Sequence, residues 1–185
     1  MKSMRIRLTR RQIAIGLLAT VGGGAAAVWS SNRSDRTQLE LELPPAGNPF
    51  NPTYEVFLAL SKIVLMRSRL DDELARRLYQ VFEEEPWGPK HVGHAYAVFR
   101  NALLKADQAA VERAPVELSA LDAGERWFVG HLVTTWYLGI YYHEQRPTRR
   151  ITLAGALMYD AVRGVVPIPY HDSIGFGGWT EPPKS

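Results

Sequence analysis

A small, mainly α-helical bundle is the fold class that this 185-residue sequence predicts, with an extended N-terminal linker and an irregular Pro/Gly-rich C-terminal arm. Apolar residues recur at helical spacing in four segments between residues 53 and 138. Prolines cluster on both sides of these segments, and no alternating run is long enough to predict a sheet. We therefore divide the chain into a signal segment, 1–27, a linker, 28–52, and a helical domain with its arm, 53–185.

Residues 1–27 have the parts of a twin-arginine export signal. In order, these parts are the basic residues Arg5 and Arg7, the pair Arg10 and Arg11, the apolar run 13–21 and the A-x-A cleavage pattern of Ala25 and Ala27. Such signals direct folded proteins across the bacterial inner membrane, which predicts the twin-arginine export machinery as a partner and the periplasm as the location. Three glycines at 22–24 disfavour a permanent membrane helix. A membrane-tethered binding protein that keeps this segment is the alternative.

Charge and cysteine content exclude several classes of protein. The chain has 22 basic and 19 acidic residues, and residues 1–27 hold five of the basic ones and none of the acidic ones. The remainder is therefore slightly acidic, which argues against a nucleic-acid partner. The sequence has no cysteine, so disulfides, thiolate metal sites and covalent haem attachment are excluded on this chain.

The linker and four helices follow in order. Residues 28–52 contain the stretches SSNRSDRT and LPPAGNPFNP, which predict an extended chain. The apolar stripes of the first two predicted helices are Phe57, Leu60, Val64 and Leu65, then Leu74, Leu78, Val81 and Phe82. Those of the last two are Val92, Tyr96, Phe99 and Leu103, then Trp127, Phe128, Leu132, Trp136 and Leu138. Asp71 to Glu73 and Asp122 are expected at helix N-termini.

Histidines are the main candidates for chemistry on this chain. His91 and His94 share a helix face and could bind a metal, although no acidic residue at helical spacing completes a ligand set. Two further histidines, in the neighbouring pairs His143–Glu144 and His171–Asp172, could act in acid–base chemistry, and His131 lies near an apolar face. We interpret all five as structural or interfacial, and expect no catalytic residue and no metal ligand. An autonomous exported metalloenzyme or hydrolase is the alternative.

Aromatic residues are too numerous in the C-terminal half for a small bundle to bury them all. The apolar run 127–142 is too short to span a membrane and is expected to supply the central helix of the core. Exposed aromatics of this kind indicate a partner surface. We predict that this interface includes Trp136, Tyr137, Met158, Tyr159, Pro167, Pro169, Tyr170 and Trp179.

Three stretches carry a family resemblance. WYLG at 136–139, ALMYDAVRGVVPIPY at 156–170 and GGWTEPP at 177–183 resemble the small subunit of the membrane-bound, FAD-dependent sugar and polyol dehydrogenases, which oxidise sorbitol, fructose or glucose. Relatives tend to carry a cysteine after IPTY, whereas this chain has Pro169, Tyr170 and His171. The role of that cysteine is therefore not transferred to this chain.

The resemblance implies a non-catalytic role. In the family, a large subunit of the glucose-methanol-choline type binds FAD and oxidises the sugar, and a multihaem cytochrome c subunit takes the electrons and attaches the complex to the membrane. The small subunit carries the export signal for its folded partner. No cofactor is expected on this chain, because the sequence contains neither a G-x-G-x-x-G turn nor a G-x-x-x-x-G-K loop. FAD and haem c are expected on the partner subunits.

Overall fold

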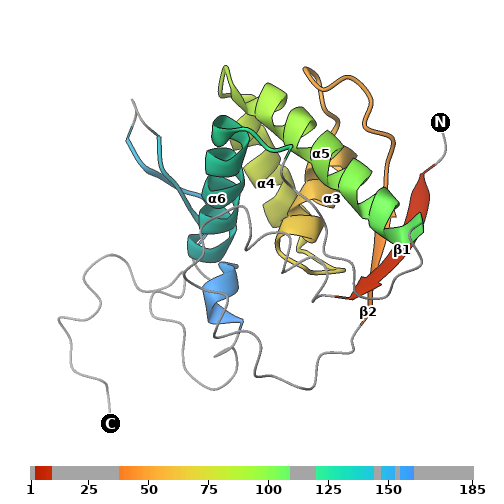
Figure 1. The fold of residues 1–185 in the computed structure, drawn as a ribbon. Helices are drawn as coiled ribbons and strands as arrows, with labels where there is room; N and C mark the ends of the chain where they lie inside the picture. The colour runs from red at the N-terminus through yellow and green to blue at the C-terminus, as the bar shows by residue number, and fades with distance from the viewer. Residues whose placement is uncertain (1–2, 10–37, 109–119, 144–146, 153–154, 161–185) are drawn as a thin grey trace, which may run out of the picture. The chain divides into compact units, whose positions relative to one another are not determined.

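The structure is a computed structural model that describes residues 3–9, 38–108, 120–143, 147–152 and 155–160 (Figure 1). The chain divides into two compact units, Met1–Val133 and Thr134–Ser185. Four long helices dominate the described residues, which confirms the mainly α fold class. The predicted C-terminal arm, residues 165–183, lies outside the described residues.

The four predicted helices are all present. They are α3 (Tyr54–Val64), α4 (Asp72–Glu83), α5 (Gly88–Gln108) and α6 (Ala123–Leu138), of which α6 begins in the first unit and ends in the second (Figure 1). In the first unit, α5 packs against both α3 and α4. The predicted stripe of α5 forms the centre of this packing, since its four residues are at most 1% exposed: Val92, Tyr96, Phe99 and Leu103.

The ends of α4 follow the local sequence. The side chain of Asp71 accepts a hydrogen bond of 2.7 Å from the backbone N–H of Leu74, and therefore satisfies one of the free donors of the first turn. Acidic residues at 72 and 73 complement the helix dipole there. The apolar stripe of α4 buries Leu78 and Phe82 completely.

Two small sheets correct the expectation that the chain forms none. In the first unit, β1 (Met4–Thr9) pairs antiparallel with β2 (Gln38–Leu43). The sequence QLELEL at 38–43 alternates with period two, and this six-residue run is enough for a strand because a partner and the helices cover its apolar face. Thus β1 lies within the predicted signal segment and β2 within the predicted linker.

The second unit begins within α6 and continues in short elements. Gly139 ends the helix with a φ of +66° and donates its N–H to the carbonyl of Thr135. A side chain at this position would approach the Thr152 carbonyl oxygen to 2.3 Å, so only glycine fits. The two-residue strand β3 (Ile140–Tyr141) then pairs antiparallel with β4 (Arg149–Arg150). The 3-10 helix η1 (Leu157–Tyr159) follows.

Candidate partner interface

Half of the predicted interface residues can be located in the structure. Tyr137 is 41% exposed and Met158 is 39% exposed, while Tyr159 is half-buried. Trp136 differs from these residues because its side chain is fully buried in this chain. In this conformation its indole belongs to the interior and offers no surface to a partner. The other four residues lie outside the described part of the chain: Pro167, Pro169, Tyr170 and Trp179.

The β3–β4 ladder explains why neighbouring tyrosines differ in exposure. Tyr141 is fully buried and its ring lies 4.5 Å from that of His143, whereas the adjacent Tyr142 is 46% exposed. Successive side chains in an extended chain point to opposite sides, so only one of the two tyrosines can face inward. Tyr137, Tyr142 and Met158 are therefore the large apolar side chains that the second unit exposes among its described residues.

A second concentration of rings lies in the first unit and is called here the aromatic–histidine cluster. It comprises Phe82, Trp87, His91, Trp127, Phe128 and His131. Phe82 and Phe128 are fully buried with ring centroids 5.5 Å apart, while Trp127 is 46% exposed and stacks on His131 at 5.3 Å. Aromatic rings that contact one another edge-to-face or in stacks stabilise the fold by more free energy than the burial of their area alone supplies. This cluster thus has a buried centre, Phe82 and Phe128, surrounded by three half-buried rings and one exposed tryptophan.

Acidic residues from the start of α6 meet the two histidines of α5. Asp122 and Glu125 form a capping box, in which each side chain accepts a hydrogen bond from the other residue's backbone N–H, at 2.7 and 2.9 Å. Glu125 also lies 3.5 Å from Nδ1 of His94 and is only 6% exposed. The sequence gives little sign of this contact because helical spacing reports only neighbours within one helix.

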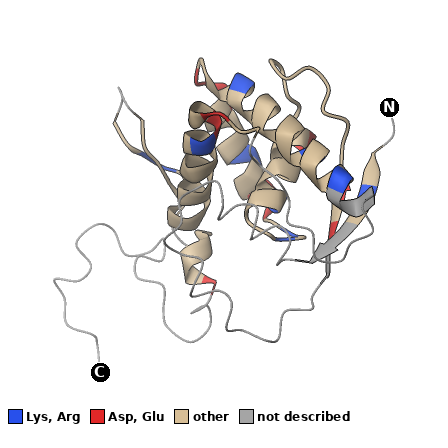
Figure 2. Cartoon of the chain, in the orientation of Figure 1, with Lys and Arg blue, Asp and Glu red and all other residues tan. Residues whose placement is uncertain are grey.

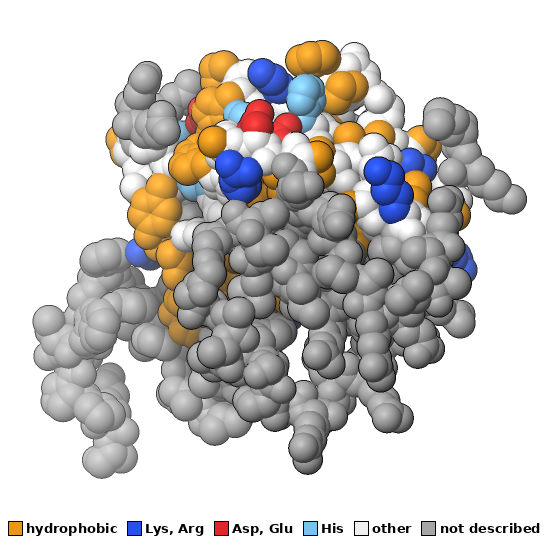
Figure 3. All heavy atoms as spheres, viewed as in Figure 1, with side chains coloured by type: hydrophobic (Ala, Val, Ile, Leu, Met, Phe, Trp, Pro, Cys, Tyr) orange, Lys and Arg blue, Asp and Glu red, His pale blue; other side chains and the backbone are white. Residues whose placement is uncertain are grey.

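The pKa values of His91 and Asp122 are both lowered, but for different physical reasons. Burial lowers the pKa of His91 below its ordinary value, although the carboxylate of Asp122 raises that pKa in part. Backbone N–H donation from Glu125 lowers the pKa of Asp122. On the face drawn in Figure 3, histidine side chains lie beside acidic ones, with hydrophobic side chains around them. Within the described ranges, no group of three or more His, Asp or Glu residues is arranged to hold a metal ion.

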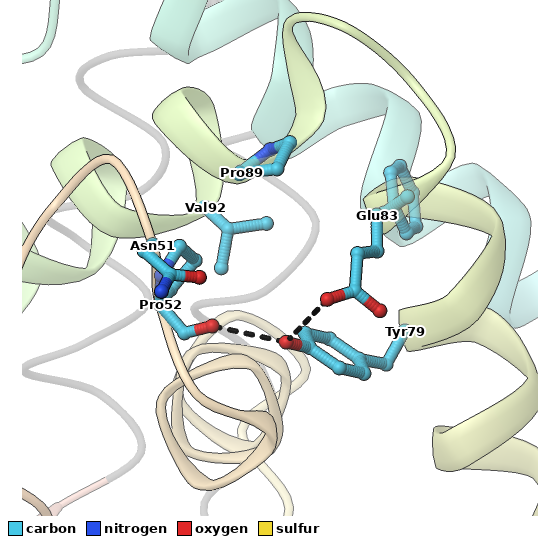
Figure 4. Close-up of a pocket in the computed structure, with 7 residues that line it drawn as sticks. Asn51, Pro52, Tyr79, Glu83, Pro89 and Val92 are labelled. Atoms are coloured by element: carbon cyan, nitrogen blue, oxygen red, sulfur yellow. Dashed lines mark hydrogen bonds between the residues drawn. The ribbon is translucent and has the colours of Figure 1, made fainter.

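A shallow hollow lies between residues of the predicted linker and two helices, α4 and α5. Its lining residues are Asn51, Pro52, Tyr79, Phe82, Glu83, Pro89 and Val92 (Figure 4). The hydroxyl of Tyr79 lies across it, 3.0 Å from the carbonyl oxygen of Pro52 and 3.4 Å from Oε1 of Glu83. The space inside it that is open to the centre of a water-sized molecule is about 10 Å³, which is roughly enough for one water molecule and far too little for a drug-sized ligand. These residues do not fit a flavin dinucleotide.

Across the described segments, no helix combines the length and the apolar composition that crossing a bilayer requires. The apolar run 13–21 lies outside these segments, as do Arg10 and Arg11. The predicted targeting residues therefore remain a prediction from sequence.

Comparison with known families decides the relationship that the C-terminal motifs indicate. A family described as membrane bound FAD containing D-sorbitol dehydrogenase matches residues 8–183. The chain belongs to this family. The match to the D-sorbitol dehydrogenase family confirms the resemblance drawn from residues 136–183 and extends it over nearly the whole chain. A comparison with curated proteins returned no match.

Proposed function

We propose that this chain is the non-catalytic small subunit of an FAD-dependent sugar or polyol dehydrogenase, and that it escorts, exports and stabilises the flavoprotein subunit. The family match over residues 8–183 carries the proposal. The presence of Arg10 and Arg11 on the same chain supports the export role. In the proposed complex, the large subunit of the glucose-methanol-choline type holds FAD, and a multihaem cytochrome c subunit holds haem and attaches the assembly to the periplasmic face of the inner membrane.

The need for a folded export route follows from the cofactor. FAD is available in the cytoplasm, so a flavoprotein that is loaded there must cross the membrane folded. A partner chain that carries the twin-arginine signal meets this requirement if it binds the loaded flavoprotein before export. The described residues that support such binding are Tyr137, Tyr142 and Met158, because exposed aromatic side chains and methionine are enriched at protein interfaces.

The experiment that tests the export role replaces the arginine pair. Arg10→Lys with Arg11→Lys is expected to keep both this chain and the flavoprotein in the cytoplasm, because the export receptor reads the pair itself. Cell fractionation followed by immunodetection of both chains measures the distribution. Arg33→Lys with Arg36→Lys is the matched control, since it makes the same chemical change downstream of the predicted cleavage pattern.

Two results separate the parts of the proposal. Retention of both chains by the first variant and normal export of both by the control support the escort role. Normal export of the flavoprotein alongside cytoplasmic retention of this chain contradicts the escort role. That result still supports the interpretation of Arg10 and Arg11 as the export signal of this chain.

A further inference from the structure

The sheet of β1 and β2 ties the predicted export segment to the folded first unit. Its register runs from Met4 opposite Leu43 to Thr9 opposite Gln38. β1 therefore ends directly before Arg10, and β2 begins downstream of the A-x-A pattern at Ala27. The ladder thus joins residues on the two sides of the predicted cleavage position.

The apolar face of this sheet is part of the core. Ile6 on β1 and Leu41 on β2 are each 2% exposed, and Leu43 is fully buried. β1 packs against α5, and β2 packs against α3. A strand whose central side chain is buried to this degree contributes to the hydrophobic core in the same way as the helices do.

Charge on the outer face selects the same register. In the backbone register, Arg5 is opposite Glu42 and Arg7 is opposite Glu40. Figure 2 shows acidic positions on β2. Opposite charges directly across an antiparallel pair stabilise it. A slip by one residue would separate these pairs and turn Ile6 away from the core. Basic positions of the predicted signal segment therefore lie opposite acidic positions of the predicted linker in the backbone register.

β2 is held in place by the helical body independently of β1. The hydroxyl of Tyr96 and Nε of Arg100, both on α5, donate hydrogen bonds of 2.6 and 3.1 Å to the carbonyl oxygen of Pro44, directly after the strand. Further along, Gly93 allows α5 to contact Pro49, whose carbonyl oxygen would lie 2.0 Å from any added Cβ. Removal of β1 would therefore leave a fixed strand with an open edge and an uncovered Leu41.

We propose that Met4–Thr9 is a resident strand of the mature protein and stays on β2 after export. The N-terminal segment then has two roles, as an address during transport and as a strand of the first unit afterwards. If the chain is not cleaved, β1 stays covalently attached to the rest of the protein. If the chain is cleaved after Ala27, the ladder with β2 and the burial of Ile6 hold β1 in place. This inference rests on the proposed export of the chain but does not depend on the proposed flavoprotein partner.

The test uses protein exported by the cell. The full chain with a C-terminal tag is purified from the periplasm without denaturant, and its peptides are quantified by mass spectrometry under denaturing conditions. Peptides covering Met4–Thr9 are expected in an amount equal to those of α3 and α5. Folded periplasmic protein that melts cooperatively and lacks these residues would overturn the proposal.

A second measurement tests the pairing directly on chain kept in the cytoplasm by Arg10→Lys with Arg11→Lys. Hydrogen exchange is followed at the β2 amides that face β1. In the same background, Ile6→Asp is expected to speed this exchange at least about tenfold, because it places a charge in the core. Arg77→Glu, a charge reversal on the exposed face of α4, is the matched control and should leave β2 exchange unchanged.

Charge-reversal variants on the two strands test the same pairing a second time. Arg5→Glu with Arg7→Glu should speed exchange in β2, and adding Glu40→Arg with Glu42→Arg should restore protection. Equal exchange in all variants would show that β1 does not cover β2. The exchange measurements need neither export nor the flavoprotein, so failure of this inference is distinguishable from failure of the proposed function.

Discussion

Both units of the chain combine buried and exposed aromatic side chains, but among the described residues the first unit has the larger aromatic core. In the first unit, Phe57, Phe82 and Phe128 are fully buried, and the ring of Phe82 lies 5.8 and 5.5 Å from the other two. In the second unit, Trp136 and Tyr141 are fully buried, whereas their neighbours Tyr137 and Tyr142 are more than 40% exposed. The first unit also exposes one tryptophan, Trp127, at 46%. Rings that contact one another inside a core stabilise the fold, whereas rings left in water are available to a partner.

The larger aromatic core lies in the first unit, and the exposed described residues of the predicted interface lie in the second. We infer that the first unit supplies most of the stability of the chain and that the second supplies the contacts with the flavoprotein. A substitution in the first unit should therefore change the free energy of unfolding, and one in the second should change affinity. Each prediction below tests one side of this division.

The largest expected effect is on the stability of the first unit. Phe82 contacts rings from α3, α6 and the segment before α5, and its side chain is fully buried. Phe82→Ala should lower the free energy of unfolding by about 3–5 kcal/mol, because it leaves a cavity in a packed core. Urea unfolding followed by circular dichroism measures this change. Phe82→Leu, which keeps most of the volume, should cost clearly less, and equal losses would contradict the packing account.

The next largest effect is expected on partner affinity. Trp179 lies in the predicted C-terminal arm, and Trp179→Ala should weaken flavoprotein binding by roughly 30- to 1,000-fold, the range for loss of an interface hot spot. The helical circular dichroism signal should stay nearly unchanged. Trp127→Ala is the comparison in the first unit, where an exposed tryptophan should contribute less to binding. Reduced thermal stability with unaltered affinity in the Trp179 variant would show that this tryptophan packs against its own chain and not against the flavoprotein.

A smaller effect is expected at the start of α6. Asp122→Ala removes the side-chain acceptor for the N–H of Glu125 and should lower the free energy of unfolding by about 0.5–2 kcal/mol. Asp122→Asn, which keeps an acceptor, should recover most of this loss. Chemical denaturation of the three proteins measures both changes. A neutral Asp122→Ala would show that the capping box does not stabilise α6.

The smallest expected effect is a pH dependence from His91. Its pKa is lower in the folded chain than the ordinary value of 6.5, mainly because of burial, with Lys90 and His94 acting in the same direction and Asp122 and Glu125 opposing. The unfolded chain therefore binds the proton more readily, so this contribution to stability is present above about pH 6.5 and is lost as the pH falls through the folded pKa. His91→Gln should flatten this dependence in denaturation curves recorded between pH 7 and 5.

Direct observation of the imidazole provides the check on that pH prediction. NMR titration of the His91 ring in the folded chain should give a midpoint below 6.5. A midpoint at or above that value would contradict the burial argument.

The helices of this chain could be predicted from sequence because each carries its own signal. The stripe from Val92 to Leu103 and the caps at Asp71 and Asp122 are local patterns, and the structure confirms all of them. β1 could not be predicted in the same way, because its residues also fit a basic export segment. Only pairing with Gln38–Leu43, far along the chain, makes them a strand.

Candidate interface residues were harder to predict than the core. Trp136 and Tyr137 are neighbours with similar chemistry, and the direction of each side chain on α6 decides that one is fully buried and the other is 41% exposed. The meeting of His94 with Glu125 likewise depends on how α5 and α6 pack. Spacing along one helix cannot report such contacts between helices.

If this chain escorts a flavoprotein, the two chains should leave the cytoplasm as one complex, so isolation of the exported complex tests the escort role. The chain with a C-terminal tag is expressed together with the untagged flavoprotein, purified from the periplasm and examined by native mass spectrometry and flavin absorbance. The account predicts that the tagged chain brings down the flavoprotein with bound FAD in a fixed ratio. A tagged chain that purifies alone as a cooperatively folding monomer, while the flavoprotein reaches the periplasm without it, would contradict the account.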